Sequence, residues 1–193
     1  MYLFFDTETT GLPANFNAPH TQVDNWPRMV QLAWSLYDEN EMFVSQSNDI
    51  IKPEGYRIPL HASKIHGITT EYALKNGVNL KTTLKKFSEA LDDAQIIIAH
   101  NIAFDEKIIG AELIRKNVSS ALFKTQRFCT MKSTIDFCKI PGYRGHKWPK
   151  LSELHEILFN QGFEDAHNAE ADTQACAKCF FELKRRGIID VIT

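Results

Sequence analysis

The chain has 193 residues, of which 44 % are hydrophobic and 24 % are charged, and its formal net charge at neutral pH is −2. With only nine Gly and seven Pro, this composition excludes a fibrous or disordered chain and is typical of a single globular domain, here residues 1–193. The slightly acidic balance also excludes nucleic-acid binding through a generally basic surface, so such binding would need local basic patches or bound cations.

The first half of the chain is predicted to form strands followed by a helix. Aromatic and β-branched residues predict strands at 2–8, 28–37 and 42–52, and a short polar stretch joins the last two as a hairpin. Apolar residues at helical spacing predict a helix over 80–94, which leads into a strand at 95–100. Because that strand contains three consecutive isoleucines, we expect it to be buried on both faces of a sheet covered by helices.

The second half of the chain is predicted to be mainly helical. Its expected elements are helices at 103–117, 131–138, 151–160 and 169–186, a strand at 125–130 and a loop at 139–150. Three strands followed by alternating helices and strands predict a mixed α/β sandwich.

The chain has neither an evident leader nor a membrane-spanning stretch. The N-terminus has no basic region followed by a long apolar run, and the longest strongly apolar run, residues 95–99, is too short to cross a bilayer. We therefore expect a cytoplasmic protein with no membrane partner. Reduced thiols are expected for Cys129, Cys138, Cys176 and Cys179, and the helical context of the C-x-x-C pair at the last two predicts core packing.

Two acids, Asp6 and Glu8, stand at the end of the first predicted strand. Because alternate side chains share a face, both acids lie on the same side as Phe4, while Phe5 and Thr7 lie on the other side. A strand that simply runs out into solvent would also place acids there. A functional interpretation of Asp6 and Glu8 therefore depends on two further acids of the chain.

Asp105 and Asp172 each fall on an apolar stripe of a predicted helix. Asp105 shares its stripe with Ile108 and Glu112, and Asp172 shares its stripe with Cys176. Helix-dipole complementation explains an exposed acid in a first turn, but it does not explain an acid on the buried stripe. Carboxylates gathered in one place repel each other by roughly 1 kcal/mol per close pair even in water, so the pattern indicates compensation by a divalent cation, Mg²⁺ or Mn²⁺.

Such a site would suit the hydrolysis of a phosphodiester. Two divalent ions together activate a water and stabilise the leaving oxygen. His167 lies five residues before Asp172 and is the candidate general base, because the unperturbed pKa of histidine is ~6.5. The alternative is a surface or capping histidine.

Three motifs occur in order along the chain: FFDTETTGL at 4–12, HNIAFDEKII at 100–109 and HNAEADTQA at 167–175. In this order and context the chain resembles the DEDDh group of DnaQ-like 3′-to-5′ exonucleases, over roughly residues 1–186. The resemblance implies a ribonuclease H-like fold, which is a three-layer sandwich of a five-stranded mixed sheet flanked by helices.

The resemblance also implies roles for individual residues. Asp6, Glu8, Asp105 and Asp172 would bind two metal ions, and His167 would deprotonate the attacking water. The product would be a nucleoside 5′-monophosphate released from a free 3′ end. The pocket for the 3′-terminal nucleotide would be lined by Thr9, Thr10, Gly11, Leu12, His66, Asn101 and Phe104.

Two points near this pocket stay open. Core packing is the alternative for Phe104, and the chain has His61 where relatives often have an acid upstream of His66. The loop at 139–150 contains Tyr143 and Trp148 among basic residues, a composition that suits base stacking and phosphate binding or a plain solvated loop.

The sequence therefore predicts a metal-dependent exonuclease that acts on single-stranded or frayed 3′ ends of DNA or RNA, in proofreading or repair. One alternative is a proofreading subunit that acts mainly by binding a DNA polymerase, and another is an RNA-trimming exoribonuclease. A third is a binding module without catalysis, which is disfavoured because none of the four acids or the base is missing. DNA and RNA are not distinguished, because a two-metal site recognises the phosphate and the 3′ terminus.

Overall fold

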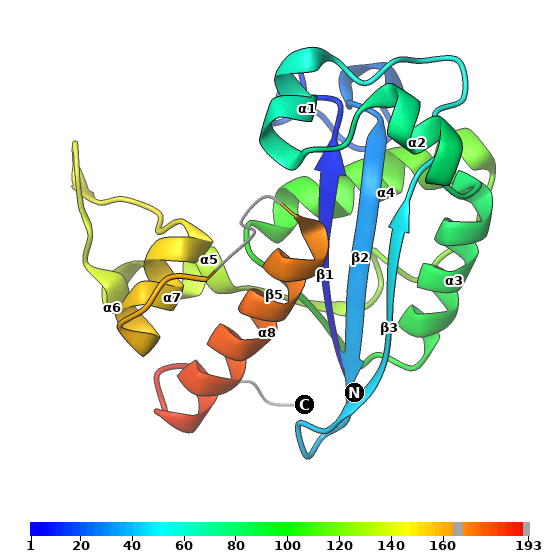
Figure 1. The fold of residues 1–193 in the computed structure, drawn as a ribbon. Coiled ribbons are helices and arrows are strands. Elements are labelled where there is room, and N and C mark those ends of the chain that lie inside the picture. The colour runs from blue at the N-terminus through cyan, green and yellow to red at the C-terminus, as the bar shows by residue number, and fades with distance from the viewer. Residues whose placement is uncertain (164–167, 191–193) are drawn as a thin grey trace.

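The computed structural model describes residues 1–163 and 168–190, and its centre is a five-stranded sheet (Figure 1). The strands are β1 (Tyr2–Thr9), β2 (Met29–Tyr37), β3 (Phe43–Ile50), β4 (Ile96–Ala99) and β5 (Gln126–Cys129). Their order is β3-β2-β1-β4-β5. β2 pairs antiparallel with β1 and β3, whereas β4 pairs parallel with β1 and β5, so the sheet is mixed as predicted.

Helices cover both faces of this sheet. α3 (Leu80–Asp92) and α4 (Ile102–Lys116) lie on one face, and α7 (Leu151–Phe159) and α8 (Ala169–Arg185) lie on the other (Figure 1). The short elements are η1 (Val23–Asn25), α1 (Leu60–His66), α2 (Thr70–Asn76), α5 (Thr130–Ser133), α6 (Ile135–Cys138), β6 (Pro141–Gly142) and β7 (Gly145–His146). α1 and α2 lie over the end of the sheet at which β1 ends (Figure 1). The predicted three-layer sandwich of a five-stranded mixed sheet flanked by helices is confirmed.

The alternation of side chains along β1 divides the core into two clusters. Phe5 belongs to the cluster beneath α3, where its ring centroid lies 5.5 Å from that of Phe87. Phe4 belongs to the cluster beneath α8, where its ring centroid lies 5.4 Å from that of Phe180. The period of two along β1 is therefore confirmed, and it continues into the polar residues at the end of the strand.

Three features differ from the sequence prediction. The helices α1 and α2 are not predicted, because each has seven residues and buries so few of them that its apolar period is weak. The helix expected over 131–138 is divided into α5 and α6 at Thr134, whose φ of −112° is not helical and whose Oγ1 donates to the carbonyl of Thr130. The loop expected over 139–150 contains a small hairpin, in which β6 pairs antiparallel with β7.

The cysteines are all free thiols. Cys176 and Cys179 are buried in the cluster beneath α8, so the prediction of core packing for the C-x-x-C pair is confirmed. Among the described residues, no helix combines the length and the apolar character needed to cross a bilayer.

Candidate active site

The candidate site lies where β1 ends, because three chain segments meet at that edge of the sheet. β1 and β4 are parallel, so the carboxyl end of β1 lies beside the turn that leads from β4 into α4. The pairing of β1 with β2 shifts register between Glu8 and Thr9, an irregularity that ends regular pairing at the acids. The first turn of α8 covers the same edge from the other layer (Figure 1).

Three of the four predicted acids form one close group. Carboxylate oxygens of Asp6 and Glu8, from β1, and of Asp172, from the first turn of α8, lie within 4.8 Å of one another. This spacing allows all three to ligate one ion. The prediction that Asp6 and Glu8 share one face of the strand is confirmed, and that face is the one toward α8.

Asp105 approaches the group from the opposite layer. It lies in the first turn of α4, it is 3 % exposed, and its Oδ1 accepts hydrogen bonds from Thr7 Oγ1 at 2.7 Å and from the backbone N–H of Thr7 at 3.1 Å. Thr7 points away from Asp6 and Glu8, as expected for its place in the strand. Asp105 is therefore buried as predicted, although the close group found among the described residues does not include it.

Burial and neighbouring negative charges raise the pKa of three of these acids, Asp6, Glu8 and Asp105. Burial raises the pKa of Asp6 well above its usual range, and the charges of Asp105, Asp172 and Glu8 raise it further. Burial, followed by the charges of Asp172 and Asp105, raises the pKa of Glu8 to about 8. Burial raises the pKa of Asp105 to about 7, although the hydrogen bonds from Thr7 act in the opposite direction. Clustered hard oxygen ligands whose charges raise one another's pKa fit a divalent cation such as Mg²⁺ or Mn²⁺.

The start of α8 is anchored on the sheet, which positions Asp172. The side chain of Asn168 accepts a hydrogen bond from the backbone N–H of Glu170 and caps the helix. Asn48 of β3 donates to Glu170 at 2.8 Å, and Asn48 in turn accepts a hydrogen bond from Gln31 of β2. The sequence analysis missed these supports, since their partners are far apart in the chain. His167, the predicted base, lies outside the described residues.

A cavity of about 440 Å³ adjoins Glu8. Five of the predicted pocket residues line it, namely Thr9, Gly11, Leu12, His66 and Phe104. α1 forms the opposite wall with Ala62 and Ile65, which the sequence analysis missed because α1 itself was not predicted. Gly11 has a φ of +148°, and a Cβ atom there would lie 3.4 Å from His61 Nε2, so glycine lets the chain pass close to α1.

His66 presents a hydrogen-bond donor within this cavity wall. Its Nδ1 accepts a hydrogen bond from the backbone N–H of Ile68 at 3.1 Å, which assigns the proton of the neutral ring to Nε2. Nε2 is buried and has no hydrogen-bond partner among the described residues. Burial lowers the pKa of His66, while the backbone carbonyl of Thr9 acts in the opposite direction. A neutral ring of this tautomer presents its N–H at Nε2, on the side of the cavity.

The other two predicted pocket residues lie elsewhere. Thr10 faces β2, where its backbone N–H donates to the carbonyl of Arg28 and its hydroxyl accepts from the N–H of Arg28. Asn101 lines a second cavity of about 580 Å³. This second cavity is bounded by Asp6, Asp172, His100, Asn101, Trp148 and Lys150. Thr10 and Asn101 therefore do not line the cavity of His66, and their contact with a substrate stays a prediction.

His100 connects the second cavity to the chain that follows the hairpin. Its Nδ1 lies 3.0 Å from Thr130 Oγ1, and its Nε2 lies 2.9 Å from the carbonyl oxygen of Pro149. The sequence analysis missed this residue, although its place directly after the apolar strand, at the edge that carries the acids, is a usable signal.

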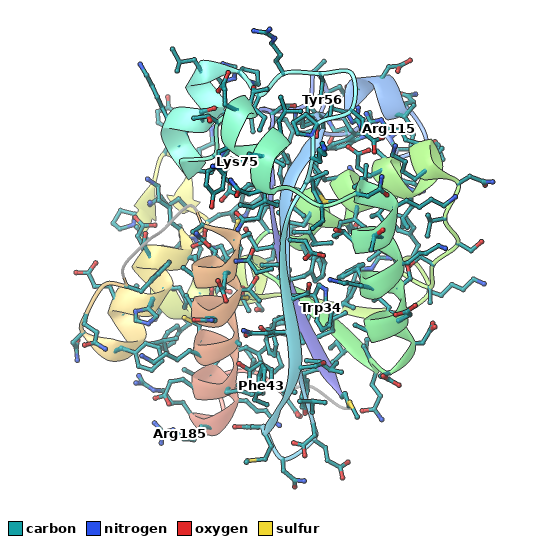
Figure 2. All side chains as sticks on the ribbon, turned by 45° about the vertical axis from the view of Figure 1, so that its right-hand side comes forward. Trp34, Phe43, Tyr56, Lys75, Arg115 and Arg185 are labelled. Atoms are coloured by element: carbon teal, nitrogen blue, oxygen red, sulfur yellow. The ribbon has the colours of Figure 1, made fainter. Side chains whose placement is uncertain are left out.

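The basic end of α8 is not part of this site. Lys184 contacts Tyr2 and Glu41, and Arg185 pairs with Glu182. Figure 2 shows Arg185 at the opposite end of the molecule from Tyr56. The helix-dipole explanation for these basic residues therefore agrees with their position.

Comparisons with known proteins agree with this fold. A family model described as Exonuclease matches residues 3–180. The PolC-type DNA polymerase III of Mycoplasmopsis pulmonis is 27 % identical over 195 residues, a match that covers 97 % of this chain and 12 % of that protein. The chain thus spans about an eighth of the length of this relative.

Two solved structures of exonuclease I from E. coli share the fold. The complex with a dT13 oligonucleotide has a TM-score of 0.75 and 21 % identity, covering 96 % of this chain and 41 % of that one. The zinc-bound form of the complex with single-stranded DNA has a TM-score of 0.72 and 22 % identity, covering 96 % of this chain and 40 % of that one.

Proposed function

Because the chain belongs to the DnaQ-like family of 3′-to-5′ exonucleases, we propose that it hydrolyses phosphodiester bonds at the 3′ end of a nucleic acid and releases nucleoside 5′-monophosphates. The observation that carries this proposal is the group of Asp6, Glu8 and Asp172 at the junction of two cavities. Among the described residues, the neighbouring charges that shift the pKa of Asp6 and Glu8 are negative, as expected of ligands for a cation.

In this proposal, Asp6, Glu8 and Asp172, with Asp105, hold two divalent ions, Mg²⁺ or Mn²⁺. When bound, such ions activate water and stabilise the leaving oxygen of a phosphodiester. The complex of E. coli exonuclease I with single-stranded DNA has a zinc-bound form, which supports the use of a divalent ion. His167, next to the start of α8, is the proposed general base.

The first cavity is the proposed site of the 3′-terminal nucleoside. Its volume of about 440 Å³ falls within the range of roughly 300 to 1,000 Å³ that is usual for small-molecule sites. Leu12, Ile65 and Phe104 offer apolar contacts to a base, and His66 Nε2 offers a hydrogen-bond donor. The scissile phosphate would then lie at the acids, between the two cavities.

The test is a side-by-side digestion of labelled single-stranded DNA, duplex DNA and RNA, each with a free 3′ hydroxyl. We expect shortening from the 3′ end with Mg²⁺ or Mn²⁺, no reaction in EDTA, and none with Asp6→Ala. Asp92→Ala, an exposed acid of α3, is the matched control and should retain activity. If the wild-type protein with added metal shortens none of the three substrates, the proposal is wrong. Preferential digestion of RNA would favour an RNA-trimming role.

A proofreading role is the second candidate, and the match to PolC-type polymerases favours it. In that role the protein would remove mismatched 3′ nucleotides in association with a DNA polymerase. Faster removal of a mismatched than of a paired 3′ nucleotide, together with stoichiometric co-purification with a polymerase, would support it. Equal rates of removal for mismatched and paired 3′ nucleotides, together with no co-purifying polymerase, would count against it.

A further inference from the structure

We propose that residues 139–150, called the arm below, bind the single-stranded nucleic acid on the 5′ side of the scissile phosphodiester. This inference rests on the proposed exonuclease function and specifies how the enzyme would hold its strand. The arm consists of the β6–β7 hairpin and the residues that join it to α6 and α7. Figure 1 shows it projecting from the body beside α7, with its tip toward the end of the molecule at which β1 ends.

The base of the arm forms one wall of the second cavity, opposite two of the acids. Trp148, Pro149 and Lys150 line this cavity together with Asp6 and Asp172. A strand whose scissile phosphate lies at the acids would therefore meet the arm directly.

The base of the arm is held in place by three polar contacts. The carbonyl of Pro149 lies 2.9 Å from Nε2 of His100. Lys147 Nζ lies 2.6 Å from Glu153 Oε1, and the backbone N–H of Lys150 donates to Glu153 Oε2 at 2.8 Å. These contacts fix the backbone around Trp148 relative to the acids, so the side chain is presented in a defined place.

The composition of the arm suits a nucleic-acid strand. It contains three lysines and one arginine, Lys139, Lys147, Lys150 and Arg144, and no acid, although the whole chain carries a net charge of −2. Tyr143 is 98 % exposed and Trp148 is 60 % exposed. Exposed aromatic rings interleaved with cations bind single strands through base stacking and phosphate neutralisation, with little dependence on sequence.

The direction of the strand follows from the proposed reaction. An exonuclease that releases one nucleotide needs one nucleoside site on the leaving side of the scissile phosphate. The first cavity, walled by α1, meets that need. The remainder of the strand must then leave through the second cavity, along the wall that the arm provides. A protein partner for the arm is the competing occupant, and the experiments below separate the two.

Tryptophan fluorescence offers a direct binding assay. The chain has three Trp residues, and Trp26 and Trp34 are only 3 % and 7 % exposed, so a ligand that quenches emission reports mainly on Trp148. The Asp6→Asn variant in Mg²⁺ would be titrated with a 20-nucleotide oligothymidine, which it should bind without degrading. We expect saturable quenching that Trp148→Phe, added to the same variant, abolishes. Binding without quenching would overturn the proposal, as would quenching that survives Trp148→Phe.

Kinetics with substrates of different length test the functional consequence. For a 20-nucleotide oligothymidine we expect Trp148→Ala to raise KM by about tenfold or more, and Arg144→Ala to reduce the salt dependence of log KM by a slope of about 0.7. For a dinucleotide both effects should be smaller, since it reaches only the base of the arm. Phe43→Ala and Arg185→Ala are matched controls, because both residues lie at the other end of the molecule (Figure 2).

The outcomes separate this inference from the proposed function. A wild-type protein that hydrolyses neither substrate contradicts the proposed function itself. If the wild type is active but the arm variants have an unchanged KM for the long substrate, the arm proposal alone is contradicted. The same holds if their KM rises equally for the long and the short substrate. Either result leaves a protein partner as the occupant of the arm. Parallel titrations with oligouridine show whether RNA binds through the same stacking.

Discussion

Two buried acids on the same helix show the difference between a structural charge and a site. Asp105 and Glu112 lie seven residues apart on α4, and they are 3 % and 0 % exposed. Glu112 Oε1 lies 2.8 Å from Arg28 Nε and also accepts from the backbone N–H of Met29 at 3.0 Å. Asp105 has the neutral donors of Thr7 and faces negative charge instead. Among the described residues, Glu112 pairs with arginines, whereas the charge that raises the pKa of Asp105 is the negative charge of Asp172.

The ion pairs of Glu112 connect α4 with η1, before β2, and with Tyr56, after β3. Arg115 lies 3.1 Å from Glu112 and donates to the backbone carbonyls of Val23 and Trp26, so it ties η1 to α4. The guanidinium of Arg28 lies 4.4 Å from the ring centroid of Tyr56. Figure 2 shows Tyr56 and Arg115 at the same end of the molecule. The contacts of Arg28 and Arg115 thus join η1, α4 and Tyr56 around Glu112.

The largest expected effect is on activity, and it comes from neutralising one acid of the group formed by Asp6, Glu8 and Asp172. Asp6→Asn should lower the hydrolysis rate by at least about 10³-fold, because an amide is a weak ligand for a hard cation and the transition state loses ~4 kcal/mol of stabilisation. The same change should raise the melting temperature of the metal-free protein, since it removes one of several repelling charges. Steady-state kinetics and thermal unfolding in EDTA measure both.

The hydrolysis rate and the melting temperature of Asp6→Asn together show whether Asp6 serves the site or the stability of the fold. A structural acid would lose stability when neutralised, so a lower melting temperature of metal-free Asp6→Asn would show that the group is balanced by contacts within the protein. Asp92→Asn, an exposed acid of α3, controls for the general effect of a lost charge.

Removing the balanced acid should have the opposite effect. Glu112→Ala should lower the free energy of unfolding by about 3 kcal/mol, because it leaves the guanidinium groups of Arg28 and Arg115 partly buried without their partner. Urea unfolding measures this change. Glu54→Ala, which breaks the more exposed pair with Lys116, should cost a small fraction of that amount. Equal losses for the two variants would show that Glu112 has no special structural role.

The sequence places Asp105 and Glu112 on the same helical stripe but cannot tell them apart. Period two puts Asp6 and Glu8 on one face, and period 3.6 turns Asp105 inward, because both periods are local properties of the backbone. The partner of Glu112 is Arg28, 84 residues earlier in the chain, and no local pattern indicates that pairing.

Contacts between distant segments also explain why the sequence does not predict the residues that line the two cavities. α1 and the β6–β7 hairpin are short elements whose positions depend on contacts with distant segments, such as the contact of His100 with Pro149. Their lining of the two cavities therefore becomes visible only in three dimensions. The motif acids, in contrast, are placed by regular strands and helices whose periods are readable in the sequence.

Binding of divalent ions provides a third way to distinguish the acids of the site from Glu112. Mn²⁺ at about 30 times its dissociation constant should stabilise the wild-type protein by ~2 kcal/mol, since only the folded chain gathers the ligands. The melting temperature should rise in the wild type and in Glu112→Gln, but much less in Asp6→Asn. Differential scanning fluorimetry with and without EDTA measures the shifts. An equal rise in all three proteins would place the ion away from Asp6.

The smallest expected effect concerns the hydroxyl that holds Asp105. Thr7→Val keeps the volume of the side chain but removes the 2.7 Å hydrogen bond from Oγ1 to Asp105, while the backbone N–H bond can remain. We expect a loss of about 1 kcal/mol in transition-state stabilisation, or roughly fivefold in rate, because Asp105 is less firmly positioned. Thr7→Ser keeps the hydroxyl and should retain most of the rate. Because Thr7 also lines the first cavity, equal losses in both variants would assign the effect to cavity shape rather than to Asp105.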